Sequence, residues 1–218
     1  MLLYIPPNEG TEITHDAALR VMKYPDRGYS FLAFNLQRPI IADRCVRQAI
    51  TKAIQRQNLI DVLLSGNGRL ISDPIPPYFG AYDEMLPTNI FNAAEAKDLL
   101  DRTSWIDRDE NGVREKADSP LAFTMKTNAD NKLYSDALVM MLADLQKVGV
   151  EAQPELLEFG KLVEEVLQRR YFDTMLLSWK TGYALDPSQV WHSDAIKNGY
   201  NVGSYCNSQV DSLQLINR

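Results

Sequence analysis

Hydrophobic and polar positions are most regular in the second half of the chain. Residues 121–127, 150–156 and 172–179 are apolar stretches of strand length. Between them, residues 133–148 and 159–169 repeat apolar side chains three or four positions apart, which is the spacing of one helical face. The order strand, helix, strand, helix, strand predicts a βαβαβ unit with parallel strands and right-handed crossovers. The third strand is almost continuously apolar, which predicts burial on both of its faces.

The first half of the chain is less regular. Residues 29–36 are rich in aromatic side chains and predict a strand. Asp43 is placed to cap a helix whose apolar positions continue at helical spacing as far as Leu64, before two glycines end it. A proline-rich stretch from 74 to 87 predicts a long irregular insert, and residues 92–95 form a capping-box pattern before a short helix. Together these elements predict an α/β fold.

The composition narrows the class of protein. Hydrophobic residues make up 45% and charged residues 24% of the 218 positions, so the chain has enough apolar side chains for a folded core. The formal net charge is −6 and no basic block offsets it, which argues against a nucleic-acid partner. No apolar run approaches the roughly 20 residues that a membrane-spanning helix needs.

The segment after the third strand of the βαβαβ unit is the strongest candidate for a binding site. In open sheets with parallel strands, ligands bind beyond the carboxyl ends of the strands. This segment combines aromatic, polar and glycine residues, and the clustering of its aromatic side chains favours a ligand-facing role over a place in the core. The candidate ligand-binding residues are Trp179, Lys180, Thr181, Gly182, Tyr183, Asp186 and Trp191.

Residues 107–112 match the opening of a calcium-binding loop, D-x-D-x-N-G. The closing position falls on Asp118 rather than on a glutamate, and no pair of flanking helices is predicted. A polar turn is therefore the preferred interpretation. His15 and His192 lie in no cluster of ligands, and the sequence predicts no metal site.

The sequence evidence for catalytic residues is as weak as that for a metal site. Cys45 lies in the first turn of a predicted helix, but no histidine lies near it in the sequence to act as a base. Glu164 and Glu165 are predicted to lie on the solvent side of a helix, so they do not suggest a pair of catalytic carboxylates. Neither a nucleophile elbow nor a phosphate-binding glycine loop is present. The sequence thus predicts no catalytic residue and no cofactor.

Several motifs resemble, in order along the chain, the peptide and nickel class of extracellular solute-binding proteins of ABC importers. The resemblance spans about residues 28 to 218. It rests on residues 34–39 (FNLQRP), 46–50 (VRQAI), 74–77 (PIPP), 95–100 (EAKDLL), 172–173 (FD), 177–179 (LSW), 186–187 (DP) and 191–193 (WHS).

The resemblance implies a two-lobed periplasmic-binding-protein fold that closes on its ligand. Residues 1–28 would be a lead-in from a first lobe that this chain lacks. Residues 29–218 would be the ligand-binding second lobe, truncated at its C-terminal end, with Phe34 and Asn35 at the hinge. The implied function is to capture peptide-like ligands and deliver them to the membrane permease of an ABC importer. The implied location is periplasmic or extracellular, and the fragment by itself is expected to be monomeric.

Two alternatives stay open. The same scaffold could hold a nickel chelate, a haem or a sugar in place of a peptide. From a different class, an α/β enzyme could use Asp186 or Cys45, although no second titratable partner lies near either residue in the sequence. The resemblance also implies two free thiols. Some members of the family place a disulfide partner near the positions of Ser193 and Asp194, and neither is a cysteine.

The resemblance raises one question about the ligand. In peptide-binding members of the family, an aspartate three residues after the tryptophan pairs with the free amine of the peptide. Here that position is Gly182, and the next acid is Asp186, whose Asp-Pro context favours a turn. Either Asp186 binds the amine, or the amine is held by the other lobe or is absent, and we prefer the second interpretation. Lys180 would then suit an anionic group of the ligand.

Overall fold

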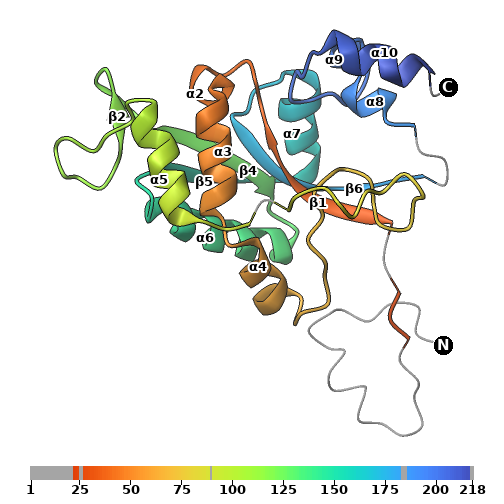
Figure 1. Ribbon diagram of the computed structural model, residues 1–218, viewed down its shortest axis with the longest axis horizontal. Helices are drawn as coiled ribbons and strands as arrows, with labels where there is room; N and C mark the ends of the chain where they lie inside the picture. Colours follow the sequence, from red (N-terminus) through yellow and green to blue (C-terminus); the bar gives the residue numbers. More distant parts are fainter. Residues whose placement is uncertain (1–21, 25–26, 89, 183–185, 217–218) are drawn as a thin grey trace, which may run out of the picture.

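A four-stranded mixed sheet forms the centre of the protein (Figure 1). The computed structural model describes residues 22–24, 27–88, 90–182 and 186–216. The strands of the sheet are β1 (Gly28–Phe34), β4 (Ala122–Asn128), β5 (Glu151–Leu157) and β6 (Thr174–Lys180), in the order β1-β6-β4-β5. β4 runs parallel to both β5 and β6, whereas β1 runs antiparallel to β6.

The predicted βαβαβ unit is confirmed. β4 is followed by α6 (Lys132–Gln146), β5, α7 (Phe159–Val163) and β6. Asn131 begins α6 because its side chain accepts a hydrogen bond from the backbone N–H of Tyr134. The helix predicted over 159–169 has the expected extent, but after Val163 it continues as a π-helix, η1 (Glu164–Gln168).

The burial of β6 differs from its apolar pattern. Only its first three residues are buried, and from Leu177 onward half-buried and exposed residues alternate. The reason is the register: β4 pairs with β6 only at Thr174 and Met175, whereas β1 pairs along the whole strand. The carboxyl half of β6 therefore extends beyond β4 and reaches solvent. The prediction of burial on both faces holds for the amino half alone.

The helix predicted between Asp43 and Leu64 is two helices, α3 (Arg44–Ala53) and α4 (Arg56–Leu63). Asp43 caps α3 as expected, because its carboxylate accepts a hydrogen bond from the backbone N–H of Cys45. The break lies at Ile54, whose backbone is extended, and Gln55. The backbone N–H of Gln55 donates to the carboxylate of Asp144 on α6, over 3.0 Å. A tertiary contact thus stabilises a break that the periodicity does not reveal.

The remaining elements are short. The insert is irregular as predicted: its described residues form turns and bends up to α5 (Ala93–Arg102), and Asn92 caps α5 as the capping-box pattern requires. The elements that the sequence did not predict are the helix α2 (Pro39–Ala42), the hairpin strands β2 (Glu115–Lys116) and β3 (Ser119–Pro120), and the helices α8 (Ser188–Trp191) and α9 (Ala195–Asn198). A last helix, α10 (Ser208–Ile216), follows α9.

Two hydrophobic cores lie on opposite faces of the sheet. The larger one joins α3, α5 and α6 to the residues of β4 and β6 that face them, among them Phe123, Met125 and Leu176. The smaller one joins α7 and η1 to Leu157 and Met175. Successive strand residues point to opposite faces, so Met175 and Leu176 belong to different cores.

Candidate ligand-binding site

The carboxyl ends of β4, β5 and β6 meet at one edge of the sheet, where the sequence predicted a site. Trp179 and Lys180 are the last two residues of β6. The antiparallel register places them opposite Tyr29 and Gly28 at the start of β1. The edge is thus formed by two segments that are far apart in the sequence.

An aromatic pair marks this edge. The half-buried ring of Trp179 lies 5.2 Å from the ring of Tyr200, centre to centre and at 59°. Tyr200 is 46% exposed and its backbone N–H is held by the carbonyl of Gln189. Tyr29 stands opposite Trp179, and burial raises the pKa of its phenol. Trp179 therefore has a ring partner on one side, and Tyr200 joins the candidate site although the sequence-based candidate residues did not include it.

Thr181 has a structural role at the end of β6. Its backbone N–H and its hydroxyl both donate to the carbonyl of Arg27, over 3.0 and 2.7 Å. The hydroxyl of Tyr78, from the irregular insert, contacts both the Thr181 hydroxyl and the Arg27 carbonyl. The insert is thereby anchored beside the candidate site, which no local pattern in the sequence indicates.

Asp186 forms the turn that its Asp-Pro context favours. Its carboxylate accepts a hydrogen bond of 3.0 Å from the backbone N–H of Ser188 at the start of α8. The residue is exposed, as are Lys180 and Gly182. Tyr183, which completes the predicted segment, lies outside the described residues.

Trp191 belongs to a different aromatic pair. It ends α8, is half-buried, and meets the ring of Tyr205 edge-on at 6.2 Å. The sequence grouped Trp191 with Trp179, whereas the ring contacts of the structure place the two tryptophans in separate pairs.

Asn35, the polar residue of the predicted hinge, is buried, with 1% of its surface exposed. Its amide donates to the carbonyls of Arg170 and Phe172, over 3.1 and 2.9 Å, and accepts from the backbone N–H of Gln37. Its own backbone N–H donates to the carbonyl of Asp173. Phe34, by contrast, ends β1 and is half-buried. The end of β1 is therefore tied to the start of β6.

Glu165 does not lie on a solvated helix face. The prediction that Glu164 and Glu165 both face solvent is therefore wrong for Glu165. Its side chain is 13% exposed and forms an ion pair with the ammonium group of Lys126, which is 1% exposed. Lys126 projects from the centre of β4 toward η1, and it also lies 3.3 Å from Glu155 and 4.7 Å from the ring centre of Tyr171. The hydrogen bond from Lys126 lowers the pKa of Glu165.

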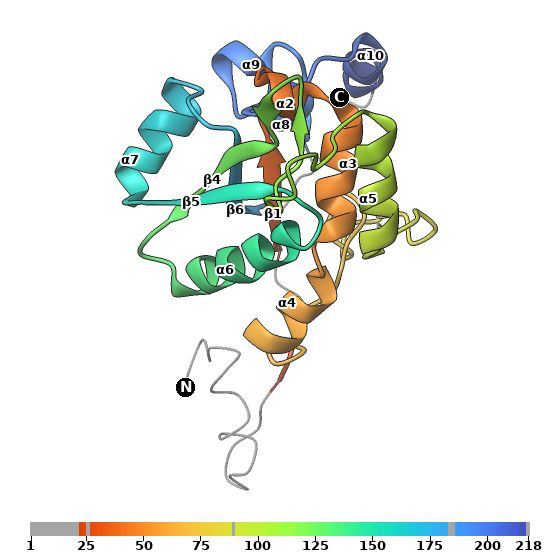
Figure 2. The ribbon, with the colours of Figure 1, turned by 90° about the vertical axis from the view of Figure 1, so that its left-hand side faces the viewer.

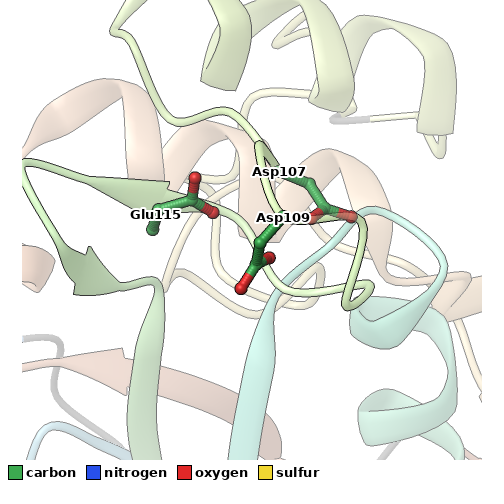
Figure 3. Close-up of side chains that lie close together, drawn as sticks. All are labelled: Asp107, Asp109 and Glu115. Atoms are coloured by element: carbon green, nitrogen blue, oxygen red, sulfur yellow. The ribbon is translucent and has the colours of Figure 1, made fainter.

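The acidic turn before the β2–β3 hairpin is shown in Figure 3. Carboxylate oxygens of Asp107, Asp109 and Glu115 lie within 4.8 Å of one another. Glu115, and not Asp118, is the acid that approaches the turn. Each member has a partner for at least one oxygen: Oδ2 of Asp107 accepts from the backbone N–H of Gly112, Asp109 accepts from Asn111, and Glu115 pairs with Arg108, while Oδ1 of Asp107 is buried without a hydrogen bond to a described residue. These contacts support the polar turn that the sequence favoured.

The two thiols are free as predicted. Cys45 is half-buried in the first turn of α3, and Cys206 is exposed. The hydroxyl of Ser193 donates a hydrogen bond of 3.2 Å to the sulfur of Cys206. Among the described residues, no helix is both long and apolar enough to span a bilayer.

The comparison that decides the family covers most of the chain. Residues 1–201 match the model of the bacterial extracellular solute-binding proteins, family 5, middle part. The chain belongs to this family. Members of this family are solute-binding proteins by description, and the predicted resemblance is confirmed.

Individual relatives agree with the family. The chain is 31% identical over 188 residues to the oligopeptide-binding protein AppA of Bacillus subtilis, covering 85% of the chain and 35% of AppA. It is 29% identical to a dipeptide-binding protein of Pseudomonas aeruginosa, covering 90% of the chain and 36% of that protein. The chain thus spans about a third of the length of these family members.

Solved structures of the family share the fold. The structure of AppA from Bacillus subtilis in complex with a nonapeptide superposes with a TM-score of 0.89 at 27% identity, over 97% of this chain and 43% of that one. NikZ from Campylobacter jejuni, in complex with Ni(L-His), superposes with a TM-score of 0.83 at 20% identity, over 97% and 43%. The predicted α/β fold, as part of a two-lobed periplasmic-binding-protein architecture, is confirmed.

Proposed function

We propose that the chain is the second lobe of a substrate-binding protein that captures peptide-like ligands for an ABC importer and delivers them to the membrane permease. The observation that carries the proposal is the Trp179–Tyr200 surface at the carboxyl edge of the sheet, in a chain 31% identical to an oligopeptide-binding protein. Aromatic faces bind side chains and backbone of varied peptides without demanding one sequence. The protein acts outside the cytoplasmic membrane and performs no catalysis.

The ligand is held at this edge by Trp179, Lys180 and Gly182, together with the neighbouring positions Tyr183, Asp186 and Trp191. Thr181 supports the site through Arg27 and Tyr78. Residues 1–28 lead in from the first lobe, residues 29–218 form the second, and Phe34 and Asn35 lie at the hinge. A peptide is favoured over a nickel chelate because, among the superposed structures, AppA in complex with a nonapeptide shares more identity with this chain than NikZ in complex with Ni(L-His) does, 27% against 20%.

The first test is to identify what the two-lobed protein carries and then to remove Trp179. Mass spectrometry of the purified protein should recover short peptides. Trp179→Ala should weaken binding of the recovered peptide at least about tenfold, roughly 1.4 kcal/mol, because half of an aromatic pair is lost. Isothermal titration calorimetry measures the change.

Tyr171→Ala is the matched control, because Tyr171 is an exposed aromatic residue just before the opposite end of β6. It should change the peptide affinity less than about threefold. Recovery of a metal chelate or a sugar in place of peptides, or equal effects of the two substitutions, would contradict the proposal.

A second prediction concerns Asp186. Asp186→Asn in the two-lobed protein should lower the affinity for the natural ligand by less than about tenfold, or roughly 1.4 kcal/mol. The physical reason is that the carboxylate caps the turn into α8 through Ser188, a contact that an asparagine oxygen can also accept. Asp194→Asn, at a residue whose side chain is 95% exposed, serves as the control in the same titration. A loss of several kcal/mol confined to ligands with a free amine would instead identify Asp186 as the amine anchor.

A further inference from the structure

A cleft of about 420 Å³ lies along α3 and α5, away from the carboxyl edge of the sheet. Figure 1 and Figure 2 both show these two helices side by side. The cleft begins beside Phe34, which pairs with Thr174 at the opposite end of β6 from Trp179. It is therefore separate from the candidate peptide site. The residues that line it are Phe34, Arg44, Arg47, Gln48, Thr51, Lys52, Glu95 and Leu99.

The lining is basic, although the chain as a whole carries a net charge of −6. Arg44, Gln48 and Lys52 are spaced four residues apart, so they form one row along α3 that extends over about 12 Å. Glu95 is the one acid among the described lining residues, and it pairs with Lys52 over 2.9 Å. At the amino-terminal end of the row, Arg44 thus forms no ion pair with another described residue, although Asp43 lies next to it in the sequence.

The two arginines at this end are incompletely satisfied. Arg47 donates through one nitrogen to the carbonyls of Ile41 and Ala42 at the end of α2. Burial lowers the pKa of Arg47, and the charge of Arg44 adds to this effect while Asp43 opposes it. Arg44 is exposed and has no ion pair with another described residue. Two neighbouring guanidinium groups that face one cleft are suited to a carboxylate, which accepts hydrogen bonds from both.

The polar and partly exposed lining of the cleft favours a segment of a protein partner over a small free ligand. Pockets for small molecules are mostly apolar and enclose most of the ligand. Here five of the lining residues are charged or polar members of α3, and two of them, Arg44 and Gln48, are exposed. A partner that offers an acidic segment could extend along the row without being enclosed.

We propose that the α3–α5 cleft is a docking surface for an acidic segment of a protein partner. If the proposed function holds, that partner is the membrane permease. The negative charge on the rest of the chain would repel an acidic partner elsewhere, so the cleft would also orient the encounter. The surface is distinct from the peptide-binding edge, and it can be tested independently of it.

The test uses an end-blocked hexaglutamate peptide as the probe, titrated into the purified protein by calorimetry. Binding should be detectable at an ionic strength of about 0.02 M and should weaken at about 0.3 M, because exposed charges are screened by salt. Arg44→Glu should weaken it at least about tenfold, and Gln48→Glu should do the same by adding a negative charge to the row. Both positions are exposed, so the variants are expected to fold.

Two controls make the outcome decisive. Lys97→Glu changes the net charge as Arg44→Glu does, but at an exposed residue of α5 that does not line the cleft. It should weaken binding of the probe by less than about threefold. Trp179→Ala reports any binding of the probe at the peptide-binding edge, and it should leave unchanged the part of the binding that Arg44→Glu removes. The proposal is overturned if the wild-type protein does not bind the probe, if Lys97→Glu is as harmful as Arg44→Glu, or if Trp179→Ala abolishes binding.

A separate experiment tests whether the partner is the permease. In cells that carry the complete importer, Arg44→Glu should slow peptide uptake at least about tenfold while the peptide affinity measured on the purified protein stays unchanged. Normal uptake by this variant would show that the permease is not the partner. If the protein binds no peptide at all, the proposed function fails, whereas binding of hexaglutamate to the cleft would still stand.

Discussion

Glu165→Gln is expected to lower the free energy of unfolding by about 3 kcal/mol at neutral pH. The substitution removes the nearest counter-charge of Lys126, a residue of β4 whose side chain is 1% exposed. An unpaired buried charge is costly, but Glu155 remains at 3.3 Å, which keeps the loss at the low end of the range for broken buried pairs. Urea unfolding at pH 7 measures the difference.

Glu164→Gln is the matched control for Glu165→Gln, since it makes the same chemical change one residue earlier. The side chain of Glu164 is 43% exposed and pairs with Arg169 at the surface, so its loss should cost less than about 0.5 kcal/mol. Equal destabilisation by the two substitutions would contradict the importance of the buried pair.

The same pair predicts a pH dependence. Lys126 lowers the pKa of Glu165 in the folded protein, so the unfolded state takes up a proton at this residue first as the pH falls. The stability that Glu165 contributes is fully present above its unfolded pKa, roughly 4.3, and is lost as the pH falls through the lower folded value. The difference between wild type and Glu165→Gln should therefore shrink below about pH 4.

Asn35→Asp is expected to destabilise the protein by about 3 kcal/mol at neutral pH. The amide of Asn35 donates to the carbonyls of Arg170 and Phe172, and a carboxylate would place negative oxygen against both of them at a position that is 1% exposed. Arg170 has a left-handed backbone, with a φ of 54°, so the turn before β6 depends on this support. Thermal or urea unfolding measures the loss.

Lowering the pH should partly rescue Asn35→Asp, because a protonated carboxyl can donate to one of the two carbonyls. Asn198→Asp is the control, since Asn198 is exposed at the end of α9 and should tolerate the change within about 0.5 kcal/mol. A neutral effect of Asn35→Asp at pH 7 would show that the hydrogen bonds of Asn35 do not hold the junction of β1 and β6.

Local patterns were sufficient for most of the secondary structure around the site. The helical spacing of apolar residues predicted α6 and α7, and the apolar runs predicted β4, β5 and β6. Polar capping residues such as Asn92 and Asn131 marked helix starts, because the side-chain oxygen and the backbone N–H that it accepts from lie within three residues. The order of these elements was enough to predict parallel strands and the edge at which Trp179 lies.

The candidate site was only partly predictable. Its centre, Trp179, follows from strand order and aromatic content, and the turn at Asp186 follows from its proline neighbour. Tyr200 and Tyr78 come from segments 21 and 101 residues away from Trp179, so only folding brings them to the end of β6. No spacing rule connects residues at such separations.

The sequence by itself determined the family, the α/β order of elements and the edge that carries the candidate site. The tertiary structure decided that the helix breaks at Ile54, where Asp144 accepts from the backbone N–H of Gln55, and that Glu165 faces Lys126 rather than water. The reason is the range of the forces involved. Helix spacing, capping and turns depend on neighbours within a few residues, whereas burial and ion pairing depend on which distant strand or helix packs alongside.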